Sequence, residues 1–444
     1  MSHFEIVEIG DAVDILTGYA FKSDDYVEPP KGLRLLRGDN VTPWKIRWKD
    51  AVACDNATPE IIAKYGLEPG DFVIAMDRTW IKQGLKCAVI RPSDTPSLLV
   101  QRVARLRQTA KLHRTMIPVL FQSPRFKDHV FRFQTETAVP HISKSDIQSY
   151  PIPKIPLDLQ VAIGRTAATF DQNLNSISRS LGKSALRKAG LMRELLSGRR
   201  RFLEFVESEE RIRDGWLERP SDWPFKALSE FAREANKKPV AEDIPVLSST
   251  KYDGLVDSLT YFGRRVYSDD TSNYKLVRRG QFAYATNHIE EGSIGLLQHR
   301  EAGLVSPMYT VFAIDGDALP SFLFPLFKSE RYVHRFGAMT NGSVNRRGGL
   351  RWTDFRLLKV ALPSVVEQSK IVELIELLNA EIKLLKRQRA AIEKQKRGVM
   401  ERLLSGEVII PEDVVERLNL EAEEEERQRA KDAKRPDATT ENAS

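Results

Sequence analysis

The stretch MRELLSG at residues 192–198 returns as MERLLSG at residues 400–406, 208 positions further along the chain. Upstream, LFQSPRF at residues 120–126 returns as LFKSERY at residues 326–332, and EPGDFVIA at residues 68–75 returns as RRGQFAYA at residues 278–285. The offset stays close to 208 throughout, so small insertions separate two copies of one plan. A repeat of this length predicts two whole domains and not a solenoid of small units.

The end of each copy carries apolar side chains at alternating steps of four and three residues, which predicts a long helix with one apolar side. The positions that we expect to pack are Ile163, Phe170, Leu174 and Ile177 in the first copy and Ile371, Ile375, Leu378, Ile382 and Leu385 in the second. Proline-rich segments precede both helices, and Ser-Gly ends both as a plausible C-cap.

Two such helices in one chain most simply bury their apolar sides against each other. The alternative is that each helix packs on its own globular part. Lys188 and Lys396 stand at equivalent positions within the two apolar patterns, and we expect them to interrupt a continuous apolar interface.

The globular parts, roughly 1–150 and 221–360, are rich in predicted strands. Short runs such as DFVIAM, RVARL, QFAYAT and YTVFAI are bounded by Gly, Pro, Asp or Asn. Equivalent helices are expected at IPVLFQSPRFKDHVFRF and PSFLFPLFKSERYVHRF. Residues 199–220 are interpreted as a connector with some helix, and the charged end after Pro411 as a solvated helix that frays into disorder.

Charge is unevenly distributed along the 444 residues. The whole chain holds 68 basic and 61 acidic side chains, net +7, with 41% apolar and 29% charged residues. Residues 411–444 contain 11 acidic and 6 basic side chains, which leaves 62 against 50, or +12, for the rest. A basic body is compatible with a polyanionic partner.

The two cysteines, Cys54 and Cys87, lie 33 residues apart with no CxxC motif, which indicates buried free thiols in a reducing cytoplasm. No signal peptide and no apolar run of membrane-spanning length is found. The chain is therefore expected to be cytosolic.

The sequence carries no familiar signature of catalysis. The GKS at residues 182–184 lies on the predicted helix, and the first glycine of a phosphate loop would have to stand at Ile177. There is no Asn/Asp-Pro-Pro-aromatic motif for adenine methylation, no glycine-rich dinucleotide fingerprint and no H-E-x-x-H. The sequence thus predicts a protein without a metal site and without covalent chemistry of its own.

Basic and amide side chains interleaved with aromatic ones favour contact with nucleic acid. Equivalent loops of the two globular parts differ in chemistry, as expected for two readers of different sequences on one scaffold; an ordinary solvated surface remains the alternative for each residue taken singly. The candidate DNA-binding residues are Arg34, Arg37, Asn40, Lys45, Arg47, Arg78, Trp80, Lys82, Gln83, His141, Lys144, Lys251, Tyr252, Asn287, His288, Asn341, Ser343, Asn345, Arg346 and Arg347.

With the two-copy plan in view, the chain resembles the specificity subunit of type I restriction-modification enzymes over residues 1–410. The most specific element is LPSVVEQSKI at residues 362–371, close to the family's Leu-Pro-Pro-Leu-x-Glu-Gln-x-x-Ile pattern. The first copy keeps Pro156, Gln160 and Ile163 but has Leu159 where the second has Glu367.

The resemblance implies an α+β fold with a pseudo-twofold internal repeat. Two β-rich target recognition domains would each be followed by a long helix, and the helices would form an antiparallel coiled coil in which Gln160 and Gln368 also belong to the partner surface. The implied limits are 1–152 and 221–360 for the recognition domains, 153–198 and 361–408 for the helical spacers, 199–220 for the connector and 409–444 for the tail.

The resemblance also implies the function. Each recognition domain would read one half of a split asymmetric DNA target, and a longer pair of helices would change the gap between the halves. The chain would recruit two methylation subunits and up to two motor-nuclease subunits. S-adenosylmethionine, ATP and magnesium would then be bound by those partners, with no cofactor in this chain. Open alternatives are a stand-alone DNA-binding or scaffold protein of a defence system and, less in keeping with the missing motifs, a fused enzyme.

Overall fold

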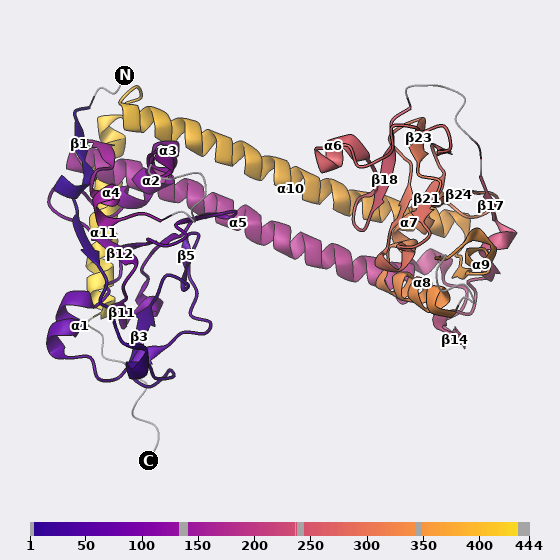
Figure 1. Cartoon of the computed structure of the whole chain (residues 1–444), viewed down its shortest axis with the longest axis horizontal. Coiled ribbons are helices and arrows are strands. Elements are labelled where there is room, and N and C mark those ends of the chain that lie inside the picture. The colour runs from indigo at the N-terminus through magenta and orange to yellow at the C-terminus, as the bar shows by residue number, and fades with distance from the viewer. Residues whose placement is uncertain (1–3, 133–140, 236, 238–243, 343–348, 434–444) are drawn as a thin grey trace, which may run out of the picture. The chain divides into compact units, whose positions relative to one another are not determined.

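The computed structural model describes residues 4–132, 141–235, 237, 244–342 and 349–433 (Figure 1). Contacts divide the chain into two compact units, Met1–Ser178 with Gln388–Ser444, and Arg179–Arg387. The division falls inside two long helices, α5 (Leu157–Leu196) and α10 (Val365–Ser405). Each unit therefore combines one globular domain with one end of each long helix.

A four-stranded antiparallel sheet in the order β10-β7-β12-β2 forms the centre of the first domain. Its strands are β2 (Asp14–Thr17), β7 (Phe72–Ala75), β10 (Cys87–Val89) and β12 (Val103–Arg107). All of β7 is buried because alternate side chains point to opposite faces: Phe72 and Ile74 enter one core cluster, Val73 and Ala75 another.

Smaller elements cover this sheet. The strands are β1 (Ile6–Glu8), β3 (Leu33–Leu36), β4 (Val41–Thr42), β5 (Lys45–Ile46), β6 (Ala53–Cys54), β8 (Trp80–Ile81), β9 (Gly84–Leu85), β11 (Ser97–Leu99) and β13 (Pro151–Pro153). The helices are α1 (Pro59–Tyr65), α2 (Met116–Gln122), α3 (Pro124–Arg132) and α4 (Lys144–Gln148), with 3-10 turns η1 (Ile9–Asp11), η2 (Ser23–Asp25) and η3 (Pro92–Asp94).

The second domain repeats this plan. Its central sheet consists, in order, of β17 (Ala232–Glu234), β24 (Tyr309–Ile314), β21 (Phe282–Ala285) and β22 (Ile294–Leu296). Strands β21 and β24 correspond to β7 and β12 of the first domain. The register agrees as well, since Ala75 pairs with Val103 in the first sheet and Ala285 with Tyr309 in the second. The predicted internal repeat and α+β class are confirmed.

The remaining elements of the second unit follow the same pattern of short strands and helices. They are β14 (Arg211–Asp214), β15 (Leu217–Pro220), β16 (Phe225–Ala227), β18 (Leu247–Thr250), β19 (Gly254–Asp257), β20 (Lys275–Arg278), β23 (Ala302–Val305), β25 (Lys359–Ala361), α6 (Ser258–Phe262), α7 (Pro320–Phe327), α8 (Glu330–Gly342), α9 (Trp352–Phe355), η4 (Leu203–Phe205), η5 (Leu228–Glu230) and η6 (Ile289–Glu291).

The long helices run antiparallel within each unit. In the first, Lys396 Nζ lies 2.6 Å from Asp171 Oδ1, and Ile163 shares a core cluster with Leu403. In the second, Ser184 Oγ donates to Glu381 Oε1 at 2.7 Å, and Leu195 shares a cluster with Ile371. Phe170, Leu174, Ile177, Leu378, Ile382 and Leu385, along the same apolar pattern, are buried or half-buried.

The helix ends also pack on the globular domains, so both arrangements considered from sequence occur. Ile163 and Ala167, in the first turns of α5, lie in the core of the domain that precedes it, whereas Leu195 at its last turn lies in the core of the other domain. The last turn of α10 likewise completes the first core through Met400 and Leu403. Each domain core thus contains residues from both copies.

The connector and the charged tail differ in how far they follow the sequence-based expectations. The connector was expected to hold some helix, but it contains only the 3-10 turn η4 before the antiparallel hairpin of β14 and β15. The charged tail forms helix α11 (Glu412–Ala433), and Arg165 Nη2 lies 3.0 Å from both Glu421 and Glu425. The expected fraying concerns residues 434–444, which lie outside the described residues.

Both cysteines are buried free thiols, as predicted, and burial raises the pKa of the Cys87 thiol well above its ordinary value. Across the described part of the chain, no helix combines the length and apolar character needed to cross a membrane.

Candidate nucleic-acid interface

In each domain a pocket lies at the same end of the central sheet, although the two pockets share few equivalent lining positions. Three chain segments meet there: the residues after β7 or β21, the turn before β12 or β24, and a segment that crosses the strand end. The crossing is marked by equivalent backbone hydrogen bonds, from Ile142 N to Met76 O at 2.9 Å and from Leu350 N to Thr286 O at 2.8 Å.

The pocket of the first domain is charged. Asp77, Arg78, Arg102 and His141 line it. Asp77 accepts from Arg102 Nη1 at 2.5 Å, and its other carboxylate oxygen is hydrogen-bonded to His141 Nδ1 at 2.5 Å. Burial alone would raise the pKa of Asp77, but these two partners outweigh it and lower the pKa. Asp77 thus orients two exposed groups with hydrogen-bonding capacity toward solvent.

Strained backbone accompanies this pocket. Arg78 and Arg102 have φ values of 47° and 64°, in the left-handed region that non-glycine residues seldom occupy. Such strain is held only where the surroundings impose it, and it is frequent at binding sites. The surroundings here fix both arginines at one edge of the sheet.

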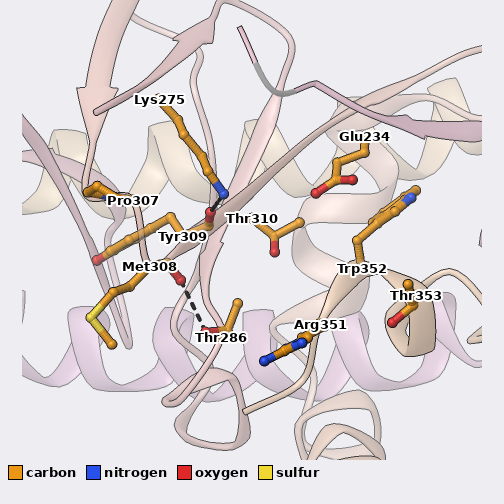
Figure 2. Close-up of a pocket in the computed structure, with 10 residues that line it drawn as sticks. All are labelled: Glu234, Lys275, Thr286, Pro307, Met308, Tyr309, Thr310, Arg351, Trp352 and Thr353. Atoms are coloured by element: carbon orange, nitrogen blue, oxygen red, sulfur yellow. Dashed lines mark hydrogen bonds between the residues drawn. The ribbon is translucent and has the colours of Figure 1, made fainter. Parts of the chain in front are cut away.

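The second pocket, shown in Figure 2, is less charged and has a volume of about 350 Å³. Trp352 stacks on Phe312 with ring centroids 5.4 Å apart, and Arg351 beside it is exposed. Lys275 Nζ donates to Tyr309 O at 2.5 Å. The lining residues are Glu234, Lys275, Thr286, Pro307, Met308, Tyr309, Thr310, Arg351, Trp352 and Thr353.

Equivalent positions therefore carry different chemistry. Arg102 precedes β12 where Met308 precedes β24, and Met76 stands where the second copy has Thr286. Different side chains on one backbone frame suit the recognition of two different ligand sequences. Arginine suits guanine edges, whereas a methionine makes apolar contacts such as those a thymine methyl accepts.

The structure brings several sequence-predicted residues to these edges. Arg78 and His141 line the first pocket, and Lys144 lies three residues beyond His141 at the start of α4. In the second domain Asn287 and His288 are exposed directly after β21. Asn341 lies in α8, while Ser343, Asn345, Arg346 and Arg347 lie outside the described residues.

Other predicted residues belong to hairpins beside the sheets. Lys45 and Arg47 are exposed on the β4–β5 hairpin, and Trp80 begins the β8–β9 hairpin whose turn holds the exposed Lys82 and Gln83. Lys251 and Tyr252 form the tip of the β18–β19 hairpin, where Tyr252 is 80% exposed.

Three of the candidate contacts serve the fold of the first domain. Asn40 is buried, accepts from Arg37 N and donates to Arg47 O, so it shapes the β4–β5 hairpin. Arg34 donates to Ser93 O at 3.0 Å and lies over the Trp48 ring at 4.4 Å. Arg37 donates to the backbone at Asp50. Each of the three side chains thus uses at least one hydrogen-bonding group inside the protein.

The assignment of Gln160 and Gln368 to a partner surface is wrong. Both are buried: Gln160 accepts from His113 N and donates to Lys111 O and Ile155 O. Gln368 makes the equivalent three bonds, from Leu319 N and to Asp317 O and Pro363 O. Each glutamine fastens the first turn of a long helix to its globular domain.

Contacts inside the protein explain why the two copies differ at Leu159 and Glu367. Glu367 is 1% exposed and accepts from Arg201 Nε and Nη2 at 2.9 Å and from Trp223 Nε1 at 3.2 Å. Leu159 instead packs against the first core, as do Val408 and Ile410. A buried ionic contact in the second unit thus corresponds to an apolar one in the first.

Sequence reasoning missed Arg102, Arg351 and Trp352. Arg351 and Trp352 stand just before Asp354, which is equivalent to Asp146, so the repeat itself offered a signal for them. One exposed cluster, His288 with Glu290 and Glu291, has carboxylate and imidazole groups close enough to hold a cation.

Comparison with known proteins agrees with this architecture. No protein-family model matches the chain. The specificity subunit of the type I restriction enzyme EcoAI from Escherichia coli is 35% identical over 154 residues, 34% of this chain and 26% of that protein. The MjaVIII specificity subunit from Methanocaldococcus jannaschii is 29% identical over 203 residues, 44% of this chain and 46% of that protein. The chain thus matches less than half the length of these relatives.

Solved structures resemble the chain over nearly all of its length. A chain from a structure of type I R-M complex assembly and conformational transition matches with a TM-score of 0.54 and 13% identity, over 91% of this chain and 98% of that one. The type I S subunit from M. genitalium matches with a TM-score of 0.52 and 12% identity, over 91% and 96%. The chain therefore has the fold of a type I restriction-modification S subunit and is similar in sequence to type I specificity subunits.

Proposed function

We propose that the chain is the DNA specificity subunit of a type I restriction-modification complex and that it reads a two-part asymmetric target. The observation that carries the proposal is the pair of equivalent sheet edges with different side chains. One scaffold used twice gives two reading surfaces, and different pockets make the two half-sites different.

The charge balance supports a nucleic-acid ligand. Residues 1–410 carry a net charge of +12, and exposed basic side chains such as Lys45, Arg47 and Lys82 stand on hairpins beside the first sheet. Contacts with phosphates would position the protein on DNA, and the groups at the pockets would select bases.

Partners complete the activity in this proposal. Two methylation subunits would methylate adenine and bind S-adenosylmethionine, and up to two restriction subunits would use ATP and magnesium for cleavage. The chain itself would recognise DNA without catalysis. Co-purification of the full-length chain with a methylation subunit tests this assembly, and a chain that binds DNA without such a partner would instead be a stand-alone DNA-binding protein.

Exchange of one recognition domain tests the modular reading. Residues 1–152 are replaced by the corresponding domain of another specificity subunit, and adenine methylation is mapped across the genome of a strain that carries the hybrid. One half of the methylated target should change and the other should stay the same. A change in both halves would contradict independent reading by two domains.

A further inference from the structure

Lys328, the residue that caps the C-terminal end of α7, joins two surface loops of the second domain. Its Nζ donates to Thr250 O at 2.8 Å and Lys251 O at 3.1 Å in the β18–β19 turn. The third bond runs to Gly292 O at 2.7 Å, at the end of η6. The three protons of one ammonium group thus match three backbone carbonyls from two separate loops.

The two loops that Lys328 joins carry candidate contact residues. The β18–β19 turn presents Lys251 and the exposed ring of Tyr252, and the η6 loop follows directly on Asn287 and His288. A further bond links the loops, from Ser293 Oγ to Ser249 O at 3.2 Å.

The same loops are also linked to the pocket in Figure 2. Ser249 N donates to the hydroxyl of Tyr309 at 3.1 Å, and Tyr309 lines that pocket. The hairpin tip, the η6 loop and the pocket therefore form one connected surface.

The three hydrogen bonds of Lys328 hold its ammonium group against the two loops. Hydrogen bonds from a charged donor are stronger than neutral ones, and here they replace water around a largely buried ammonium group. Burial lowers the pKa of Lys328 to about 8, an effect that the nearby Asp253 opposes. The C-terminal end of α7 favours a cation at this position as well.

The first domain lacks this lysine at the equivalent position. The repeat aligns LFQ at residues 120–122 with LFK at residues 326–328, so Gln122 stands where the second copy has Lys328. Gln122 accepts a hydrogen bond from Lys396 of α10 and so connects α2 to a long helix. At this position the second domain therefore joins two loops to α7, whereas the first domain joins α2 to α10.

We propose that Lys328 is a positioning residue for recognition of one half-site: it holds the β18–β19 turn and the η6 loop as a single rigid reading surface. This inference rests on the proposed DNA-reading function. Lys328 does not contact DNA in this scheme; it fixes the backbone from which Lys251, Tyr252, Asn287 and His288 reach the bases. Reading by the first domain does not depend on it.

The test compares Lys328→Met with the matched control Gln122→Met in the full-length chain. Methionine keeps most of the length of the lysine side chain and removes the donors. Amide hydrogen exchange is measured in both loops, where Asp253 N and Gly292 N are hydrogen-bonded. In Lys328→Met we expect exchange about tenfold faster or more in these loops, with the core strand β21 unchanged; in Gln122→Met both loops should keep wild-type rates.

DNA reading is measured separately with a library of duplexes that contain randomised base pairs. Selection by the wild-type chain, together with its methylation partner where one co-purifies, should give a two-part motif. Lys328→Met should lose base preference in one part of the motif and keep it in the other part. Gln122→Met should keep base preference in the part that is lost in Lys328→Met.

The two measurements separate the possible failures. If exchange in the loops is unchanged in Lys328→Met, the clamp does not exist. If exchange rises but both parts of the motif persist, Lys328 holds the loops without positioning a reading surface, and the inference is wrong. If the wild-type chain selects no motif, the proposed function fails, while the exchange experiment still decides whether the clamp exists.

Discussion

The buried contact between Arg201 and Glu367 predicts a strong effect of mutation that is coupled between the two residues. Arg201 is 8% exposed in its side chain and makes a two-bond contact with Asp222, at 2.8 and 2.7 Å, besides its bonds to Glu367. Burial of Arg201 would lower its pKa, but bonds to Glu367 and Asp222 raise it above the ordinary value. The perturbation is Glu367→Leu, which copies Leu159 of the first copy.

The size of the effect follows from the contacts. Removing one member of a buried ion pair costs about 3–5 kcal/mol because the other charge stays buried. Arg201 keeps Asp222 and the carbonyl of Phe205 as acceptors, which places the loss near the lower limit, about 3 kcal/mol. For a unit of this size, about 2–4 °C are lost per kcal/mol, so the melting temperature of the second unit should fall by roughly 6–12 °C.

Scanning calorimetry of the full-length chain measures the change, and amide exchange in β15 assigns it to the second unit. The control is Glu376→Leu, the same substitution at an exposed position of α10, which should change the stability by less than about 0.5 kcal/mol. The double variant Glu367→Leu with Arg201→Leu should lose less than the sum of the two single losses, because either single change already breaks the pair; Arg201→Leu also removes the partner of Asp222. Losses that simply add in the double variant would refute the coupling.

Three other predictions follow from single contacts. Lys396→Met should destabilise the first unit by about 1–2 kcal/mol, because Lys396 Nζ binds Asp171 and Gln122. Lys188→Met, at the equivalent position, should cost no stability, because burial and Lys386 both disfavour the charge of Lys188 and lower its pKa. Urea denaturation compares the two variants, and equal losses of stability would contradict this difference. Asp77→Ala should weaken base preference in one half-site because it releases Arg102 and His141, and it should raise non-specific affinity for DNA because it removes a negative charge. Duplex selection measures the base preference, and salt titration measures the non-specific affinity. An unchanged motif would contradict an orienting role for Asp77. Raising the pH through about 8 should deprotonate Lys328, leave two N–H groups for three carbonyls and speed exchange in both loops beyond the intrinsic effect of pH, in wild type but not in Lys328→Met. Because unfolded lysine keeps its proton to about pH 10.5, this group should make the net free energy of unfolding rise between pH 8 and 10.5 even as the loops loosen.

The repeat, the strands and the long helices could be predicted from sequence because each leaves a local pattern. The continuous apolar run from Phe72 to Ala75 and the heptads of α5 and α10 are readable without any long-range contact. Because the copies are equivalent, the central strands and the long helix found in one copy could also be expected in the other.

The roles of polar side chains could not be predicted in the same way. Gln160 and Gln368 lie within helical patterns that suit a solvent-facing or partner-facing position, but their amides bind backbone groups 49 and 51 residues away. Asn40 was assigned to DNA because of its residue type, yet it completes a hairpin. Such roles depend on which carbonyls a fold leaves without partners, and sequence spacing does not reveal them.

The crossing of helix ends into the opposite copy's domain has a consequence for biosynthesis. The first core cluster extends from Ile9 to Ala167 and is completed only by Met400, Leu403 and Leu404. A ribosome that adds about 5–20 residues per second needs roughly 12–47 s to travel from Ala167 to Met400. Throughout that interval the nascent first domain exposes the apolar surface that α10 later covers. A chain released early, before its last long helix is made, would therefore leave both recognition domains available to chaperones and proteases, so that only complete chains persist as folded protein.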